Sequence, residues 1–166
     1  MRVGTALPLR LPVIALSVLG IALSAVAILL LVAAMSGVGV MAVDRATLTM
    51  ILTQTSIGWA WTVRIFALLG ILLLAVPTRC WTPLKSWCST VLAAVAIASL
   101  AWTGHGAAGE GAFGTAQLVG DVVHLLAASA WVGALIAFLM LMSTARDPET
   151  LAVTHGALTG FARAGT

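Results

Sequence analysis

TGHGAAGEGAFGTAQLVGDVVHLLAASAWVGAL, residues 103–135, joins a glycine-rich loop to a long apolar helix that carries ionisable side chains. His105 lies in the loop, and Asp121 and His124 lie in the apolar part. Only 8% of the residues in this chain are charged. An ionisable residue in a membrane helix is costly and usually marks an ion path, a metal or a cofactor. This stretch therefore predicts a membrane span and a functional site on it.

The composition places the whole chain in a membrane. Hydrophobic residues make up 61% of it, and the mean hydropathy is +1.15. Soluble domains are about 45–50% apolar and about 25% charged. The net charge of +3 does not indicate a nucleic-acid partner, because the basic residues are scattered singly and form no patch. We therefore expect an integral membrane protein whose main partner is the lipid bilayer.

The predicted fold class is all-α, a polytopic membrane protein with four transmembrane helices in a single membrane domain, residues 1–166. A crossing needs about 20 apolar residues, and four runs meet or approach that length. The first run is too long for the apolar region of a signal peptide, so we expect it to be retained. A surface helix is expected between the first and second spans, and residues 146–166 form a short polar tail. The predicted spans are residues 12–35, 57–76, 87–103 and 117–142.

Lysine and arginine positions predict the orientation, because cytoplasmic loops are enriched in these residues. With the N-terminus inside, six basic residues lie on the inner side and only Arg45 on the outer side, while Arg64 lies within a span. Both termini are then cytoplasmic, and the glycine-rich loop faces outward. The inner residues are Arg2, Arg10, Arg79, Lys85, Arg146 and Arg163.

Four side chains of the last span share one helix face, because residues three, four and seven apart lie on the same side of a helix. They are Gln117, Asp121, His124 and Trp131. The loop is short enough to bring His105 over this face. Imidazole nitrogen suits copper, zinc and iron, so His105 and His124 are candidate metal ligands. Asp121 is a third ligand or a partner that orients His124.

The supporting positions are Gln117, Trp131 and Arg64, which lies at a similar depth in the second span. We expect Arg64 to pair with Asp121 or with a loop carbonyl group. The residues also leave structural alternatives open. His124 could bond a neighbouring helix, Asp121 and Arg64 could form a purely structural ion pair, and Trp131 could serve packing.

The sulfur-containing side chains give a weaker signal. Met35, Met41 and Met50 lie near the predicted outer face, where thioether sulfur could bind Cu(I), although methionine in apolar sequence usually serves packing. Cys80 and Cys88 are too far apart for a CxxC pair. We therefore assign neither cysteine to the site.

Three segments resemble the bacterial copper resistance protein D family of inner-membrane proteins. Residues 121–133, DVVHLLAASAWVG, resemble its DxxHLLAAxxWxGG segment and give the most specific match. Residues 55–64, TSIGWAWTVR, resemble its TxFGxxWxxR segment, and residues 103–105 its TGH segment. Members of the family are longer and have more crossings, so we expect this chain to be truncated relative to typical members, either as a fragment or as a reduced relative.

The resemblance implies copper binding and copper transport across the bacterial inner membrane, for uptake, homeostasis or resistance, beside a periplasmic copper-binding protein. It implies His105, Asp121 and His124 as copper-site residues and no enzymatic activity. Two alternatives stay open: a haem b electron-transfer subunit that uses His105 and His124 as axial ligands, and an accessory membrane subunit without a metal. The oligomeric state is also left open.

Overall fold

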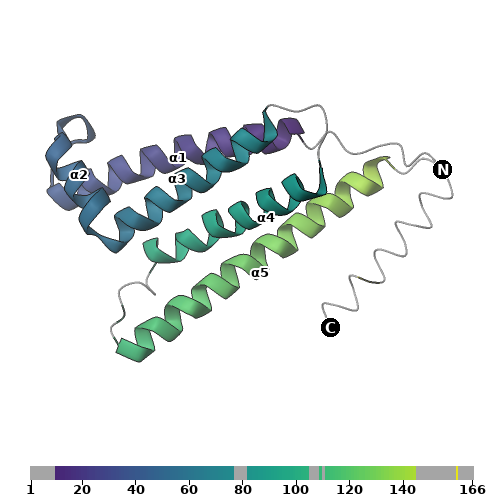
Figure 1. Cartoon of the computed structure of the whole chain (residues 1–166). Coiled ribbons are helices and arrows are strands. Elements are labelled where there is room, and N and C mark those ends of the chain that lie inside the picture. Colours follow the sequence, from purple (N-terminus) through teal and green to yellow (C-terminus); the bar gives the residue numbers. More distant parts are fainter. Residues whose placement is uncertain (1–9, 77–81, 105–108, 110, 145–159, 161–166) are drawn as a thin grey trace. The chain divides into compact units, whose positions relative to one another are not determined.

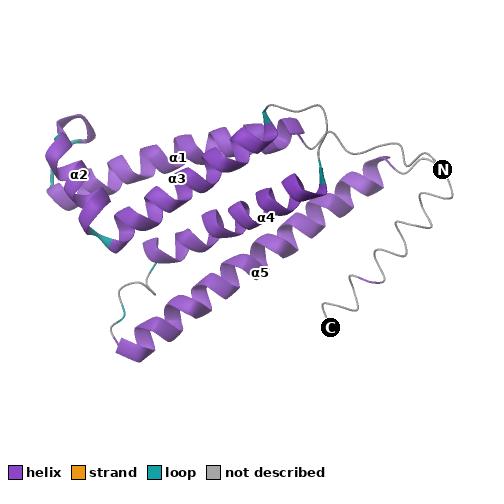
Figure 2. Ribbon diagram, viewed as in Figure 1, coloured by secondary structure: helices purple, strands orange, loops and turns teal. Residues whose placement is uncertain are grey.

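The computed structural model describes residues 10–76, 82–104, 109, 111–144 and 160. Five α-helices and two short 3-10 helices make up the described part of the chain, which contains no strand (Figures 1 and 2). Four helical segments are long and apolar enough to cross a membrane. They are Arg10–Ser36, Ser56–Ala75, Pro83–Thr103 and Gly111–Met140. The all-α prediction with four spans is therefore confirmed.

Side-chain caps and proline set the ends of the helices around the second span. α2 (Arg45–Gln54) begins after Asp44, whose carboxylate accepts a hydrogen bond from the Thr47 amide at 2.7 Å. α3 (Ser56–Ala75) begins after Thr55, whose hydroxyl accepts from the Gly58 amide at 2.9 Å. Such caps satisfy amide groups that have no partner within the helix. α3 ends at Ala75, with Val76 as its C-cap, and residue 77 in the sequence is a proline, which cannot continue a helix.

The first and third spans extend slightly beyond the predicted limits. α1 is Arg10–Ser36, and η1 (Val40–Ala42) connects it to α2. α4 (Pro83–Ala98) begins four residues earlier than predicted, because Thr82 caps it and Pro83 occupies the first turn. The span then continues as η2 (Ser99–Thr103). α2 confirms the helix predicted between the first two spans.

The last helix differs most from its predicted limits. α5 (Gly111–Thr144) begins six residues before residue 117. The sequence predicts a loop at glycines 111 and 114, but both are helical. Gly111 has φ +67°, and a Cβ atom on Gly114 would clash with the Gly109 carbonyl group. The lack of a side chain at Gly114 therefore lets the Gly109 backbone lie close against the first turn of α5.

α3 is the central helix of the first part of the chain. It packs against α1, α2, α4 and η2. The buried core forms where α1, α2 and α3 meet, and its members are Ile28, Val32, Ile51 and Trp61. Many large apolar side chains lie on the outside, whereas Ser17, Ser24, Arg64 and Ser99 are buried. Apolar surfaces around small or polar interior residues are typical of helices packed within lipid.

The chain consists of two compact units, residues 1–125 and residues 126–166, with the boundary inside α5. In the second unit, the described helical residues continue the predicted last span to Thr144. Two serines there bond to their own helix, Ser129 to the Leu126 carbonyl group and Ser143 to that of Met140. Most of the predicted polar tail lies outside the described residues.

Candidate metal centre

The predicted ligands Asp121 and His124 lie one turn apart on α5. Asp121 is half-buried and His124 is exposed in the described chain. A separation of three residues on a helix places both side chains on one face. A carboxylate and an imidazole in this relation could bind one ion together, or the carboxylate could orient the imidazole.

Gln117 links this face to the glycine-rich loop. It lies one turn before Asp121 on α5 and is exposed. A side chain added at Gly109 would meet Gln117 Oε1 at 3.7 Å. The loop backbone at Gly109 therefore lies beside the first member of the polar stripe. Trp131 lies further along α5 and is about half exposed, at 47%.

His105 lies outside the described residues, so the structure gives no geometry for the predicted pair of imidazoles. Among the residues that are described, no three histidine, cysteine, aspartate or glutamate side chains gather into a group. Of the predicted ligands, only Asp121 and His124 are among the described residues. Cys88 is a free, exposed thiol, and Cys80 lies outside the described residues.

Arg64 is the charged residue that the fold buries most deeply among those described, at 6% exposure. Its Nε donates to Ser99 Oγ at 2.9 Å, and its Nη2 donates to the Ser99 carbonyl oxygen at 3.1 Å. Its guanidinium also lies over the ring of Trp61, 4.6 Å from the centroid. The sequence predicted Asp121 or a loop carbonyl group as the partner. Among the described residues, the partner of Arg64 is Ser99, at the start of η2, while most of the loop lies outside the described residues.

Sequence reasoning missed both residues that hold Arg64. Trp61 lies three residues before Arg64 on α3, which is the spacing of helix neighbours. Ser99 is a polar residue near the end of an apolar span, and its hydroxyl also donates to the Ala96 carbonyl group at 2.7 Å. The spacing of Trp61 was readable from the sequence, whereas the pairing with Ser99 joins residues 35 positions apart.

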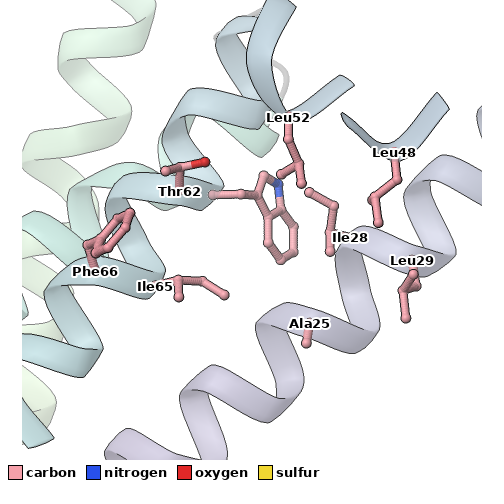
Figure 3. A pocket seen from close by; sticks show the side chains of 9 residues that line it. Ala25, Ile28, Leu29, Leu48, Leu52, Thr62, Ile65 and Phe66 are labelled. Atoms are coloured by element: carbon pink, nitrogen blue, oxygen red, sulfur yellow. The ribbon is translucent and has the colours of Figure 1, made fainter. Parts of the chain in front are cut away.

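Two cavities adjoin these buried residues, and neither is lined by a described ionisable side chain. One, of about 390 Å³, lies between α1, α2 and α3 and is bordered by Trp61; Figure 3 shows its apolar lining, including Ile28, Leu52 and Phe66. The other, of about 520 Å³, is bordered by Ser99 and by Trp59 and Trp102. Their linings do not offer the nitrogen or carboxylate ligands that a metal site would require.

Comparison with known proteins identifies the family. Residues 2–115 match the family model described as copper resistance protein D-like, N-terminal domain. The chain belongs to the copper resistance protein D family. Copper resistance protein D of Pseudomonas syringae pv. tomato is 37% identical over 169 residues, which cover 99% of this chain and 54% of that protein. The chain thus spans about half the length of this curated relative.

Family membership supports part of the predicted function directly. The family name and the four long apolar helices indicate a multi-pass membrane protein with a copper-related function, whose helices contact the bilayer. The family match includes Arg64, Ser99 and His105, and the match to the Pseudomonas protein extends to Asp121, His124 and Trp131. No solved structure matches the chain.

Proposed function

We propose that this protein binds copper at the outer side of the bacterial inner membrane and takes part in moving it across. The observation that carries the proposal is membership of the copper resistance protein D family. In this proposal copper is the cargo, the outward-facing loop admits the ion, and both chain termini are cytoplasmic. No catalytic step is assigned.

His105 and His124 are the proposed nitrogen ligands, because imidazole binds copper readily. Asp121, one turn from His124, is proposed to bind the ion or to accept a hydrogen bond from His124 and so fix its orientation. Either role offsets the charge of the ion in a span where an unpaired charge is costly. Gln117 and Trp131 are proposed to border the site on the same face of α5.

The proposed source of the ion is a periplasmic copper-binding protein that meets the outer loop. The curated relative carries the name copper resistance protein D, and delivery by a protein would avoid free copper in the periplasm. We propose that the protein transports copper across the membrane in the oligomeric state that it adopts there.

The ligand proposal can be tested with His124→Ala and His105→Ala, because each substitution removes one imidazole group. We expect each variant to bind copper at least about tenfold more weakly in detergent, since even residues beyond the ligands commonly change metal affinity by 10–100-fold. Cellular copper accumulation should fall as well. The matched control is Val123→Ala, an exposed position beside His124, which should bind copper like the unaltered protein.

Unchanged copper binding and accumulation in both histidine variants would contradict the proposal. An absorption spectrum of the purified protein separates the remaining hypotheses. A Soret band that disappears in both variants would instead favour axial haem ligation by these histidines. Equal metal content in the unaltered protein and the double histidine variant would favour an accessory subunit.

A further inference from the structure

The last span carries a line of residues with the spacing of two helices that pack side by side. Along α5, Gln117, Asp121, His124, Ala128 and Trp131 follow one another at alternating steps of four and three residues. This spacing keeps side chains on the line where one helix meets another. Asp121 is half-buried and the other four are exposed. We call this line of five residues the α5 seam.

The α5 seam is poorly suited to contact with lipid. Asp121 and His124 lie within Gly111–Met140, the apolar length of α5, where hydrocarbon cannot bond to a carboxylate or an imidazole. The most apolar 18-residue stretch of α5 is 0% buried in the described structure, whereas that of α3 is 33% buried. Polar side chains of membrane helices commonly bond to a neighbouring helix. The seam therefore needs a second helix against it.

The cation buried in α3 does not serve as that partner. Arg64 donates two hydrogen bonds to Ser99, and its guanidinium lies over the ring of Trp61. α3 itself packs against α1, α2, α4 and η2. Because these described contacts engage Arg64 without Asp121, the charge of Asp121 requires a different partner.

The α5 seam is complementary to itself. Two copies inserted in the same direction are related by a two-fold axis along the membrane normal, so their α5 helices run parallel and equal surfaces meet. Asp121 and His124 differ in height by about 4.5 Å, the rise of three helical residues. Asp121 of one copy can therefore accept a hydrogen bond from His124 of the other, and the symmetric bond forms at the same time.

Small residues allow the two backbones to approach each other. Ala128 lies on the seam, and Gly120 and Ala127 flank it. A Cβ atom at Gly120 would meet nothing within 4 Å outside the backbone of its own helix. Interfaces between membrane helices are enriched in such small residues. The seam thus combines close approach with polar groups that can bond across the interface.

We propose that two copies of this protein associate through their α5 seams, with Asp121 of each copy bonded to His124 of the other. The partner is a second copy of this chain. The inference goes beyond the proposed function and does not rest on it, because the two hydrogen bonds need no ion.

Cysteine cross-linking in membranes tests the pairing. The full chain is used, with both native cysteines changed to serine and a chelator present. Ala128→Cys places a thiol on the seam, and Ala130→Cys places one about 200° around the helix at nearly the same depth. Both alanines are exposed, so the two variants are matched. We expect iodine to join two copies of the Ala128→Cys variant through a disulfide and to leave the Ala130→Cys variant monomeric.

Exchanging the two polar residues tests the proposed hydrogen bonds. His124→Asp alone would bring four carboxylates together, and Asp121→His alone would bring four imidazoles together. In proteoliposomes that carry Ala128→Cys, each single variant should need about tenfold more protein per lipid for half-maximal cross-linking. That is the fold-change expected when two interhelical hydrogen bonds are lost. The double variant restores both pairs in reversed order and should recover the original cross-linking.

Equal cross-linking of Ala128→Cys and Ala130→Cys would indicate random collisions and would overturn the inference. Failure of Ala128→Cys to join two copies, or its cross-linking to a different protein instead, would also overturn it. A double exchange as weak as the single variants would exclude the bonds between Asp121 and His124. Because the chelator removes copper, none of these outcomes decides the proposed function, which depends on the copper measurements on the histidine variants.

Discussion

Gly58 of α3 lies directly against the carbonyl group of Ile51 in α2, with no room for a Cβ atom between the two backbones. A side chain at Gly58 would also meet Leu52 Cα at 2.6 Å. The sharp connection between α2 and α3, from Gln54 to Ser56, depends on this contact. α2 thus stays close to the N-terminal end of the second span.

We expect Gly58→Ala to lower the free energy of unfolding by about 1–3 kcal/mol, because overpacking forces backbone shifts. Gly70→Ala is the control on the same helix, since its nearest contact is the flexible end of Leu92 at 2.9 Å. A denaturing-detergent titration measures both. Equal effects of the two variants would argue against close backbone packing at Gly58.

Trp61 and Trp59 offer a second comparison, because they are the same residue type on the same helix. Trp61 is 5% exposed and Trp59 is 61% exposed. Trp61→Ala should cost about 3–5 kcal/mol of stability, as for other buried aromatic residues, and should release Arg64 from its ring contact. Trp59→Ala should cost much less in the same titration. Similar losses would contradict the placement of Trp61 in the core.

Much of this fold could be predicted from the sequence. Long apolar runs must form helices in lipid, where every backbone group needs a partner, so the four spans followed directly. The start of α5 was misplaced, because glycine disfavours helices on average, whereas Gly111 begins this helix with a positive φ and Gly114 packs closely against the Gly109 backbone. Local propensity does not reveal such a contact between backbones.

The candidate site could be predicted only along single helices. Helix periodicity places Asp121 beside His124 and Trp61 beside Arg64, since the two residues of each pair are three positions apart. The bond between Arg64 and Ser99 depends on how α3 and α4 pack, which no short pattern encodes. For that reason the sequence suggested Asp121 or a loop carbonyl group as the partner of Arg64 and did not point to Ser99, the partner found among the described residues.

Asp44 gives a pH-dependent prediction for α2. Hydrogen bonds from the Thr47 backbone and side chain hold the pKa of Asp44 below its ordinary value. A carboxylate with a lowered pKa in the folded state stabilises the fold when ionised, so its contribution is complete above the ordinary pKa and is lost as the pH falls through the folded value. The protection of the first-turn amides of α2 against hydrogen exchange, relative to the intrinsic rate at each pH, should therefore be constant near neutral pH and fall below about pH 4, the range of an ordinary aspartate.

Asp44→Asn is the control for this titration. Asparagine can still accept from the Thr47 amide but does not ionise, so the loss of protection at low pH should disappear. Asp44→Ala should raise exchange at every pH. An identical pH profile for the unaltered protein and the Asp44→Asn variant would contradict the role of the carboxylate.

Arg10 binds the end of a neighbouring span. Its side chain donates to the carbonyl groups of Ala75 and Val76, at the C-terminal end of α3. A cation at that end of a helix contributes about 0.3–1 kcal/mol, so Arg10→Gln should lower unfolding stability by that amount. Arg45→Gln, at the opposite end of a helix, should leave stability unchanged or raise it. A stabilising effect of Arg10→Gln would contradict this assignment.

The proposed orientation predicts which positions a membrane-impermeant thiol reagent reaches. In a protein with both native cysteines changed to serine, Met41→Cys should react in intact spheroplasts, because Met41 in η1 is fully exposed. Lys85→Cys, at the opposite end of the span that leads to the loop, should react only after permeabilisation. The reverse pattern would place the loop of His105 in the cytoplasm.

The change from α-helix to 3-10 helix at Ser99 also affects how far the third span reaches. An α-helix rises about 1.5 Å per residue, so the 16 residues of α4 cover about 24 Å. The hydrocarbon layer of a bilayer is about 30 Å thick. The five residues of η2 are drawn out at about 2.0 Å each and extend the segment to about 34 Å. The stretched final turn thus lets a segment of only 21 residues match the full thickness of the hydrocarbon layer.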